Sequence, residues 1–516
     1  MLSRLLSPLA GLLLLATVPA AAQAPAPSTA AGNRFVADSL DAYVQRGLRQ
    51  WNIPGLAVVV VKDGQVVASK GYGVRAVGKP EPVDANTLFL IASNTKLFTG
   101  TALAKLDEEK KLSLNDKVTK YLPDFQLYDP TSTQLTTVRD LLGHHLGTKT
   151  FQGDFTFWSS NLSRADIVRS MRLLQPPFQF RQEYGYCNAG FLAAGQIIPV
   201  VTGGTQWEDY VQQTMLRPLG MSSTSMSTAG FGQRPNIALP YSNAYGPLAQ
   251  LPFDHVDNLG PAASMVSNVN DLGKWLQCQI DSGKYQGRRV LSWPVVRRTR
   301  DVVTAVSARK SALLPEHFRT YGLGVFAADY NGRQVYWHTG GATGYVSNTC
   351  FVPEERLGIA ILTNQDNQSF FEALRYQLLD AYLGMPYLDR SQQLLARSRP
   401  GREGTLKDVA ALAARVAKKN KPAQQLDAYA GQYTHPLYGP IQVERKGKQL
   451  LVRFGRHPEL TATLDYMDGQ EFRTVYSNLT YGIYPAIFTL ENGQVKTLEL
   501  RVNDGIEQDP YVFSKG

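Results

Sequence analysis

Hydrophobic positions near the N-terminus predict a helix followed by a β-hairpin. Apolar side chains recur at near-helical spacing in residues 34–51, at Phe35, Leu40, Tyr43, Val44 and Leu48. Residues 55–61 are then almost entirely apolar, a turn signal follows at Asp63-Gly64, and residues 65–74 continue as a second strand. The chain therefore opens with one helix and two neighbouring strands.

The same periodicities predict that the sheet is completed from the far side of a helical block. The middle third of the chain is mostly helical, whereas residues 326–365 return to short strands. Turns separate these strands at Asn331-Gly332, in the glycine cluster of residues 340–344 and at Glu354-Glu355. Strands that are remote in sequence, placed around helices, predict an α+β domain over residues 34–391 whose sheet joins both ends.

A second domain is predicted after a charged helical stretch at residues 392–424, which is interpreted as a linker bounded by Pro400-Gly401 and Pro422. Over residues 425–516 apolar positions alternate with polar ones, in short runs separated by turns. These turns are Lys446-Gly447, Asp468-Gly469, Asn492-Gly493 and Asp504-Gly505. The pattern is typical of a small up-and-down β-barrel or a sandwich.

The first residues have the pattern of an export signal. Residues 1–22 contain a lone positive charge at Arg4, a short apolar stretch broken by Pro8, and small residues at Ala20-Ala21-Ala22. A membrane anchor is the alternative, which Pro8 and the shortness of the stretch disfavour. Residues 23–33 are then expected to be a flexible leader, and the protein is expected to be exported, to the periplasm or beyond.

Composition excludes several classes of protein. With 43% hydrophobic and 19% charged residues, a wholly disordered chain is excluded. No uncharged apolar run is long enough for an ordinary membrane span. Cys187, Cys278 and Cys350 are too few for a disulfide scaffold or a four-thiolate metal site, although a Cys278–Cys350 pair stays open.

The net charge of +10 does not by itself indicate a nucleic-acid partner, because the basic residues are spread along the chain. They form only small groups, at Arg297-Arg298, Lys418-Lys419 and Arg445-Lys446. A solvated basic surface is therefore the favoured interpretation, and no nucleic acid is expected as a partner.

Candidate chemistry begins with the segment SNTK at residues 93–96, directly after the apolar residues 88–92. If a helix begins here, Ser93 and Lys96 lie on one face a single turn apart. The positive end of that helix disfavours the cationic form of Lys96, and a neutral lysine can take a proton from the serine. The spacing recurs at residues 307–310 without the apolar run, so context favours Ser93.

Two further segments carry candidate chemistry. In YCN at residues 186–188, a tyrosine between cations would lose its proton readily and relay it, and Asn188 would hold a substrate amide. Similar segments at Tyr241 and Tyr476 show that this pattern alone is common. In HTGG at residues 338–341, a strand edge would pair with substrate, and the N–H groups of Gly341 and Ser93 would form an oxyanion hole.

In this order, the three segments resemble the serine β-lactamase and penicillin-binding-protein superfamily. The closer resemblance is to its class C-like branch of exported serine hydrolases and D-amino-acid peptidases, of the peptidase S12 type. Residues 87–125 resemble that family's nucleophile helix, residues 138–148 its Leu-Leu-x-His segment, and residues 217–224 its Pro-Leu-Gly-Met element. The resemblance covers residues 34–388, and it favours Tyr186 over its rivals because an Ala-Gly-Phe sequence follows.

The resemblance implies a fold with an antiparallel sheet flanked by helices and a helical subdomain, followed by a lipocalin-like barrel. It implies that Ser93 is the acylated nucleophile, Lys96 the general base and Tyr186 the proton relay. Substrate binding is implied for the remaining matched residues, Asn188, His338, Thr339 and Gly340, with His338 at a position that a cation occupies. Water then hydrolyses the acyl-enzyme, and no metal or organic cofactor is implied.

Some features depart from the family's pattern or stay ambiguous. True β-lactamases and transpeptidases usually carry lysine where this chain has His338, so tight binding of a substrate carboxylate is not expected. His144 and His145 are interpreted as structural. An aromatic set either lines an apolar acyl pocket or covers the core: four residues of 151–158 with Phe178, Phe180 and Tyr345.

The sequence therefore predicts an exported serine hydrolase that cleaves an amide or ester through an acyl-Ser93 intermediate. A D-amino-acid-type peptidase acting on a small molecule or peptide is favoured, with a carboxylesterase next. A catalytically idle, penicillin-recognising envelope-binding or sensor protein is the alternative from another class. The C-terminal domain would restrict access to the cleft, mediate assembly into a homo-oligomer, or stabilise the chain, and these three roles stay open.

Overall fold

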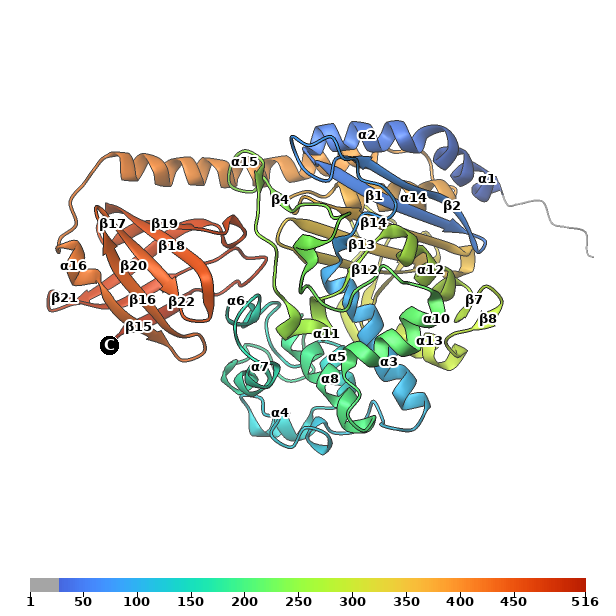
Figure 1. The fold of residues 1–516 in the computed structure, drawn as a ribbon, viewed down its shortest axis with the longest axis horizontal. Helices are drawn as coiled ribbons and strands as arrows, with labels where there is room; N and C mark the ends of the chain where they lie inside the picture. The colour runs from blue at the N-terminus through green and yellow to red at the C-terminus, as the bar shows by residue number, and fades with distance from the viewer. Residues whose placement is uncertain (1–26) are drawn as a thin grey trace, which may run out of the picture.

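A large domain built on an eight-stranded sheet and a separate closed barrel are joined by one long helix, α15 (Figure 1). The computed structural model describes residues 27–516. The predicted signal peptide, residues 1–22, lies outside the described residues. The predicted α+β class and the predicted barrel are both confirmed.

The central sheet is antiparallel throughout, in the order β2-β1-β14-β13-β12-β11-β10-β9. Its strands are β1 Gly55–Lys62, β2 Gln65–Gly73, β9 Thr304–Ser307, β10 Arg319–Tyr321, β11 Phe326–Tyr330, β12 Arg333–Ala342, β13 Tyr345–Val352 and β14 Leu357–Thr363. Strand β1 pairs with β14, with Val59 opposite Ala360, so the sheet joins both ends of the domain as predicted. Every residue of β1, β13 and β14 is buried, because helices cover both faces.

Helices α2 (Leu40–Trp51) and α14 (Phe370–Tyr382) pack on one face of this sheet, and α12 (Val269–Ile280) packs on the other. Beyond α12 lies a helical subdomain in which α3 (Thr95–Glu108) contacts α8 (Asn188–Val201) and α11 (Gly260–Ala263). Its other helices are α4 Pro130–Leu135, α5 Val138–Leu142, α6 Asp154–Phe157, α7 Arg164–Ser170, α9 Trp207–Val211, α10 Arg217–Leu219 and α13 Trp293–Arg300. Short strand pairs brace the loops: β3 Phe89–Leu90 with β6 Val266–Ser267, β4 Tyr241–Ser242 with β5 Ala249–Gln250, and β7 Lys284–Tyr285 with β8 Arg288–Arg289.

The leader predicted to be flexible over residues 23–33 is helical from Pro27, because α1 spans Pro27–Arg34 and continues into α2. Tertiary contact explains the difference. Gly32 lies so close to Tyr382 that a Cβ atom would come within 2.3 Å of its ring, and the Tyr382 hydroxyl donates to Asn33 Oδ1 at 2.9 Å. This part of the chain is therefore docked on α14, and residues 23–26 lie outside the described range.

The predicted linker is largely one helix, α15 (Arg390–Ala417), which passes through Pro400-Gly401 where a boundary was expected. Its first turn is anchored to the large domain by an ion pair of 2.6 Å between Arg390 and Asp380. Its last turn is anchored to the barrel, where Arg415 pairs with Asp468 and Glu471. Because both ends are held, the helix acts as a strut between the two domains.

The C-terminal domain begins with α16 (Leu426–Tyr429) and closes as a barrel in which each strand pairs with the next and β15 pairs with β22. The strands are β15 Gly431–His435, β16 Gly439–Lys446, β17 Gln449–Phe454, β18 His457–Asp468, β19 Glu471–Tyr476, β20 Ile483–Glu491, β21 Gln494–Leu500 and β22 Tyr511–Lys515. The up-and-down order is therefore confirmed and a sandwich is excluded.

Two expectations about cysteines and membranes can be compared with the structure. Cys187, Cys278 and Cys350 are all free and buried, so the pairing of Cys278 with Cys350 that the sequence left open does not form. Within residues 27–516, none of the helices combines the length and the apolar character that crossing a membrane requires.

Helix α3 packs so closely against residues 322–325 that Gly100 has no room for a side chain. A Cβ atom there would come within 1.9 Å of the Leu323 carbonyl oxygen. We predict that Gly100→Ala destabilises the large domain by about 1–3 kcal/mol through overpacking, which a lower urea midpoint of its unfolding transition would show. Gly404→Ala is the matched control, because Gly404 lies in α15 with open space around it and alanine favours helices. Equal midpoints for the two variants would contradict this packing.

Candidate active site

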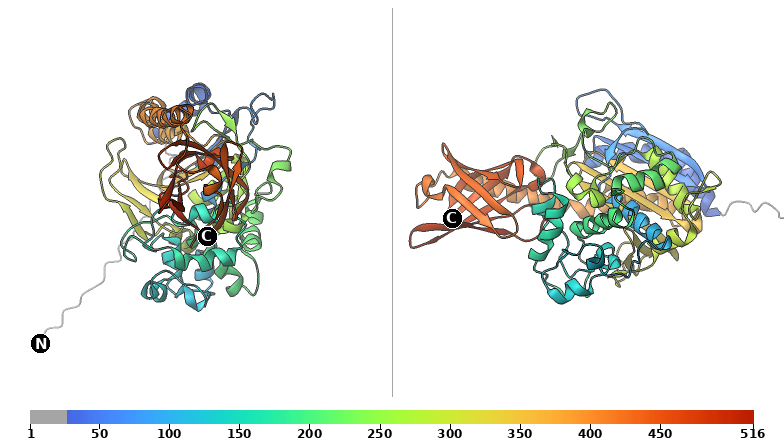
Figure 2. Two further views of the ribbon diagram at one scale, coloured as in Figure 1. Left: turned by 90° about the vertical axis from the view of Figure 1, so that its left-hand side faces the viewer. Right: turned by 60° about the horizontal axis from the view of Figure 1, so that its bottom comes forward.

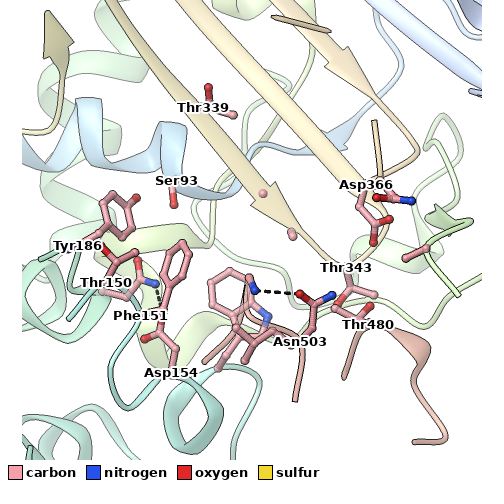
Figure 3. Close-up of a pocket in the computed structure, with 18 of the residues that line it drawn as sticks. Ser93, Thr150, Phe151, Asp154, Tyr186, Thr339, Thr343, Asp366, Thr480 and Asn503 are labelled. Carbon is pink, nitrogen blue, oxygen red and sulfur yellow. Dashed lines mark hydrogen bonds between the residues drawn. The ribbon is translucent and has the colours of Figure 1, made fainter. Parts of the chain in front are cut away.

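Ser93 lies on a sharp strand-to-helix turn. It follows β3 and occupies a 3-10 turn (Ala92–Asn94) directly before α3, so the helix begins two residues later than the sequence suggested. Ala92 has a φ of +45°, a left-handed conformation that is strained for alanine. Ser347 holds the turn by donating from its hydroxyl to the Ile91 carbonyl at 2.6 Å. The strained turn presents Ser93 to a cavity (Figure 3).

Lys96 is fully buried behind Ser93, and its amine has three neighbours. Nζ lies 3.1 Å from Ser93 Oγ, 2.6 Å from Asn188 Oδ1 and 3.0 Å from the Ala262 carbonyl oxygen. Both carbonyl oxygens can only accept, so a neutral amine donates its two protons to them and turns its lone pair to the serine hydroxyl. The arrangement therefore suits a base that removes the Ser93 proton.

Burial also sets the charge of this lysine. It lowers the Lys96 pKa to about 7, against the opposing effect of the negative charge of Asp154. At neutral pH a large share of Lys96 is therefore uncharged, as a general base in a Ser–Lys pair requires.

Tyr186 lies beside this pair and is neutral. Its ring centroid is 4.6 Å from Lys96 Nζ, and its buried hydroxyl has no hydrogen-bond partner among the described residues. Burial raises the pKa of Tyr186 above its ordinary value, so the expectation that it loses its proton readily is wrong. A proton relay at this position would have to pass through the neutral hydroxyl.

His144 supports Tyr186 from behind, as the structural interpretation of this histidine predicted. Its ring lies 4.2 Å from the Tyr186 ring, and its Nδ1 accepts from the Cys187 backbone N–H at 2.9 Å. Burial lowers the His144 pKa well below its ordinary value, so the ring is neutral and can accept. His145 is only half-buried and does not line the cavity.

Asn188, at the first turn of α8, connects Lys96 to a carboxyl group that the sequence analysis missed. Its Nδ2 donates to Asp154 Oδ2 at 2.6 Å while its Oδ1 accepts from Lys96. Both ends of the amide are thus engaged within the protein, whereas the sequence assigned Asn188 to substrate. The one available signal for Asp154 was a lone acid inside the aromatic run at residues 151–158.

His338 on β12 is neutral, so the cation expected at this position is not present. Nδ1 lies 2.8 Å from the Thr339 carbonyl oxygen and must carry the proton, which leaves Nε2 to accept from the Tyr321 hydroxyl at 3.0 Å. Burial lowers the His338 pKa to about 3, and Lys96 acts in the same direction. Tyr321, which fixes this tautomer, is a second residue that the sequence analysis did not identify.

The glycines of the same strand differ in their surroundings. Thr339 and Gly341 line the cavity, whereas Gly340 does not. A Cβ atom at Gly340 would come within 2.0 Å of the Ile91 carbonyl oxygen, so Gly340 allows β12 to approach the Ser93 turn closely. Its expected contact with substrate is therefore wrong, while the oxyanion hole formed by the Ser93 and Gly341 N–H groups stays a prediction.

The cavity in front of Ser93 has a volume of about 590 Å³ and is lined by both domains. In Figure 3, Ser93 and Tyr186 lie at one end, and Asp366, Thr343 and Thr480 lie at the other. The barrel contributes a set of loop residues to the wall, namely Leu479, Thr480, Asn503, Gly505 and Ile506. The barrel therefore restricts access to the cleft, one of the three roles that the sequence left open.

The aromatic residues that the sequence analysis could not assign divide between the cavity and the cores. Phe151 and Trp158 line the cavity. Phe157 belongs to the core of the large domain, and Phe155 belongs to the core of the barrel. The other three, Phe178, Phe180 and Tyr345, do not line the cavity. Within residues 27–516 there is also no group of three His, Cys, Asp or Glu side chains arranged to hold a metal ion.

Comparison with known proteins gives matches for both domains. Residues 40–383 match the family model described as Beta-lactamase, and residues 415–515 match the one described as Domain of unknown function (DUF3471). The unguisins hydrolase ungD' of Aspergillus campestris is 28% identical, over 78% of this chain and 76% of that protein. Protein flp of Staphylococcus aureus is 27% identical, over 64% of this chain and 63% of that protein.

Two solved structures share the fold. The octameric penicillin-binding protein homologue from Pyrococcus abyssi aligns with a TM-score of 0.58 at 22% identity, over 93% of this chain and all of that one (100%). The class C beta-lactamase from Rhodobacter sphaeroides aligns with a TM-score of 0.53 at 21% identity, over 68% of this chain and 99% of that one. At these identities the likeness concerns the fold alone.

We predict that Ser93→Ala abolishes covalent labelling by a fluorophosphonate probe and that Lys96→Ala slows it by orders of magnitude, because proton abstraction fails. Peptide mass spectrometry would locate the label. Ser307→Ala and Lys310→Ala are matched controls with the same sequence spacing, in a partly exposed segment outside the cavity. Undiminished labelling of Ser93→Ala would show that the nucleophile lies elsewhere.

The pH dependence of this labelling follows from the lowered Lys96 pKa of about 7. Neutral Lys96 is the active form, so the labelling rate should be constant well above pH 7 and fall about tenfold per pH unit below it. Stopped samples between pH 5 and pH 9 would give the profile. A rate still rising steeply between pH 8 and pH 9 would contradict a neutral lysine at physiological pH.

Proposed function

The chain belongs to the beta-lactamase family of serine hydrolases, and we propose that it cleaves amides as a D-amino-acid-type peptidase. The observation that carries the proposal is the buried Ser93–Lys96 pair, in which the lysine is held neutral between two carbonyl oxygens. A pair of this kind activates a serine for attack on an acyl carbon.

In the proposed reaction, Ser93 Oγ attacks the carbonyl carbon while its proton passes to Lys96. The Ser93 and Gly341 N–H groups stabilise the negative charge that develops on the carbonyl oxygen. As the C–N bond breaks, the proton passes through the neutral Tyr186 hydroxyl to the leaving amine. Water then attacks the acyl-serine ester with Lys96 again as base, which releases the acid and restores Ser93.

The charges around the cavity favour a substrate with a free amino group near the scissile bond. Among the described residues of its lining none is lysine or arginine, His338 is neutral, and Asp154 and Asp366 are the ionisable acids. Asp366 Oδ2 accepts from the Gly344 N–H at 3.0 Å, while the buried Oδ1 has no partner among the described residues. An ammonium group would satisfy that oxygen, whereas a substrate carboxylate would meet only like charge.

A carboxylesterase is the second candidate, because the cavity also has an apolar part. Phe151, Trp158 and Phe326 line it together with Ile506 of the barrel. Such a lining suits the acyl chain of an ester. A catalytically idle envelope-binding protein is the remaining alternative, and it would show no labelling of Ser93.

Export and assembly are part of the proposal. The pattern of residues 1–22 supports export, and N-terminal sequencing of the chain recovered from the periplasm or medium would test it. Self-association through the barrel is supported by one structural neighbour, the octameric homologue from Pyrococcus abyssi. Light scattering of the purified chain would test it, and a monomer would contradict it.

We predict that D-alanine p-nitroanilide is turned over faster than its N-acetylated form and that a penicillin is hydrolysed slowly at most. Released chromophore measures the two anilides, and mass spectrometry detects any acyl adduct on Ser93. A p-nitrophenyl acyl ester is the comparison that separates an esterase from an amidase. Efficient hydrolysis of the ester without any amidase activity would favour the carboxylesterase.

Asp366→Asn should raise KM for the free-amine anilide several-fold and leave KM for the N-acetylated anilide unchanged. The reason is that only the free amine carries the charge with which Asp366 interacts. Burial raises the Asp366 pKa to about 6, so the difference should diminish as the pH falls through 6. Equal effects on both substrates would assign Asp366 to the structure of the loop.

A further inference from the structure

Helix α6 lies between the two domains, and its consecutive residues face different partners (Figures 1 and 2). Asp154 faces Asn188 in the catalytic site, Phe155 and Thr156 face the barrel, and Phe157 packs in the core of the large domain. One short helix therefore connects the barrel to the residues that surround Lys96.

The barrel holds this helix through an aromatic insertion. The Phe155 ring is 1% exposed and lies among the barrel's core residues, with centroids 5.0 Å from Tyr438 and 5.1 Å from Tyr511. Aromatic pairs at such separations prefer defined geometries, so the ring fixes the position of the helix as well as burying apolar area.

Hydrogen bonds on both sides of Phe155 add to this attachment. Glu507 Oε2 accepts from the Gly153 N–H at 2.6 Å, and the Thr156 and Tyr511 hydroxyls are 3.2 Å apart. His457 Nε2 lies 2.9 Å from the Trp158 carbonyl oxygen and donates to it. The barrel therefore holds the backbone immediately before and after Asp154.

Asp154 in turn fixes which way the Asn188 amide faces. A carboxylate only accepts, so the Asn188 NH₂ group must point to Asp154 and the amide oxygen must point to Lys96. Without that carboxyl group the amide is free to rotate, and its NH₂ group would then oppose the donors of Lys96. The orientation of the general base thus depends on a side chain that does not touch it.

We propose that Asp154 is a positioning residue for Lys96 and that the barrel, by holding α6, completes the catalytic site. This inference rests on the proposed function, because it takes Lys96 as the base that activates Ser93. It assigns a role to the domain matched by the family model of unknown function: the barrel supplies part of the cavity wall and keeps Asp154 against Asn188.

The charge of Asp154 gives the proposal a second, separable effect. The titratable groups that face Lys96 come from every neighbouring element: Asp154 on α6, His144 after α5, Tyr186 and Cys187 before α8, and His338 on β12. Glu507 of the barrel lies behind Asp154. In this set the negative charge of Asp154 favours the Lys96 cation, so its removal lowers the Lys96 pKa.

The first test compares Asp154→Ala with Asp154→Asn in the full chain, by the rate of fluorophosphonate labelling of Ser93 from pH 5 to pH 9. Asp154→Ala should label at least about tenfold more slowly above pH 8, because a displaced catalytic group costs orders of magnitude. Asp154→Asn keeps an acceptor oxygen and loses only the charge. It should retain most of the rate above pH 8 and shift the acid limb of the profile to lower pH.

The second test addresses the barrel with Phe155→Ala and the matched control Phe472→Ala. Phe472 is a fully buried barrel residue whose aromatic neighbours are Tyr429, Tyr466 and Phe488, so it does not contact α6. Phe155→Ala should label about tenfold more slowly, and Phe472→Ala should label at the wild-type rate wherever near-UV circular dichroism shows both variants folded. If Phe472→Ala does not fold, Phe472→Leu takes its place.

The outcomes separate this proposal from the proposed function. A wild-type chain that no fluorophosphonate labels at Ser93 would overturn the proposed function, and the positioning role with it. A labelled wild type whose Asp154 variants keep its rate and its pH profile would overturn the positioning role alone. Equal rates for Phe155→Ala and Phe472→Ala would overturn the part assigned to the barrel.

Discussion

The burial of one lysine, Lys96, is the constraint on which the rest of the site depends. An unpaired ammonium group is costly away from water, so burial favours the neutral amine, which is the form that can activate Ser93. The same dry surroundings keep Tyr186 and His338 uncharged. A site without a resident cation follows, and it explains why the cavity is suited to substrates that lack a carboxylate near the scissile bond.

Both domains maintain these surroundings. Helices α3, α8 and α11 enclose the amine from the large domain, and the α6 segment, held by the barrel, supplies Asp154 from the other side. Strut α15 is anchored to both domains, at Arg390 and at Arg415, and so limits how far they can separate. The barrel is therefore better understood as a wall and support of the catalytic site than as an independent appendage.

Local patterns predicted much of this fold, and tertiary contacts account for what they missed. Alternation and turn residues were sufficient for the β1–β2 hairpin and for the barrel, and helical spacing placed Lys96 one turn from Ser93. The helix at Pro27–Arg34 depends on contact with α14, which no local pattern reports. The charge states of Tyr186 and His338 depend on burial, and the Asp154–Asn188 contact joins segments whose proximity only the fold establishes.

The most direct test of the central claim is the titration of the Lys96 side chain itself. The full chain would carry lysine labelled with ¹³C at Cε, and the signal missing from a Lys96→Met sample would be followed by NMR between pH 5 and pH 11. The account predicts a midpoint at about pH 7, far below that of the other lysines. A Lys96 signal that stays protonated to pH 10 would contradict a neutral base and the mechanism built on it.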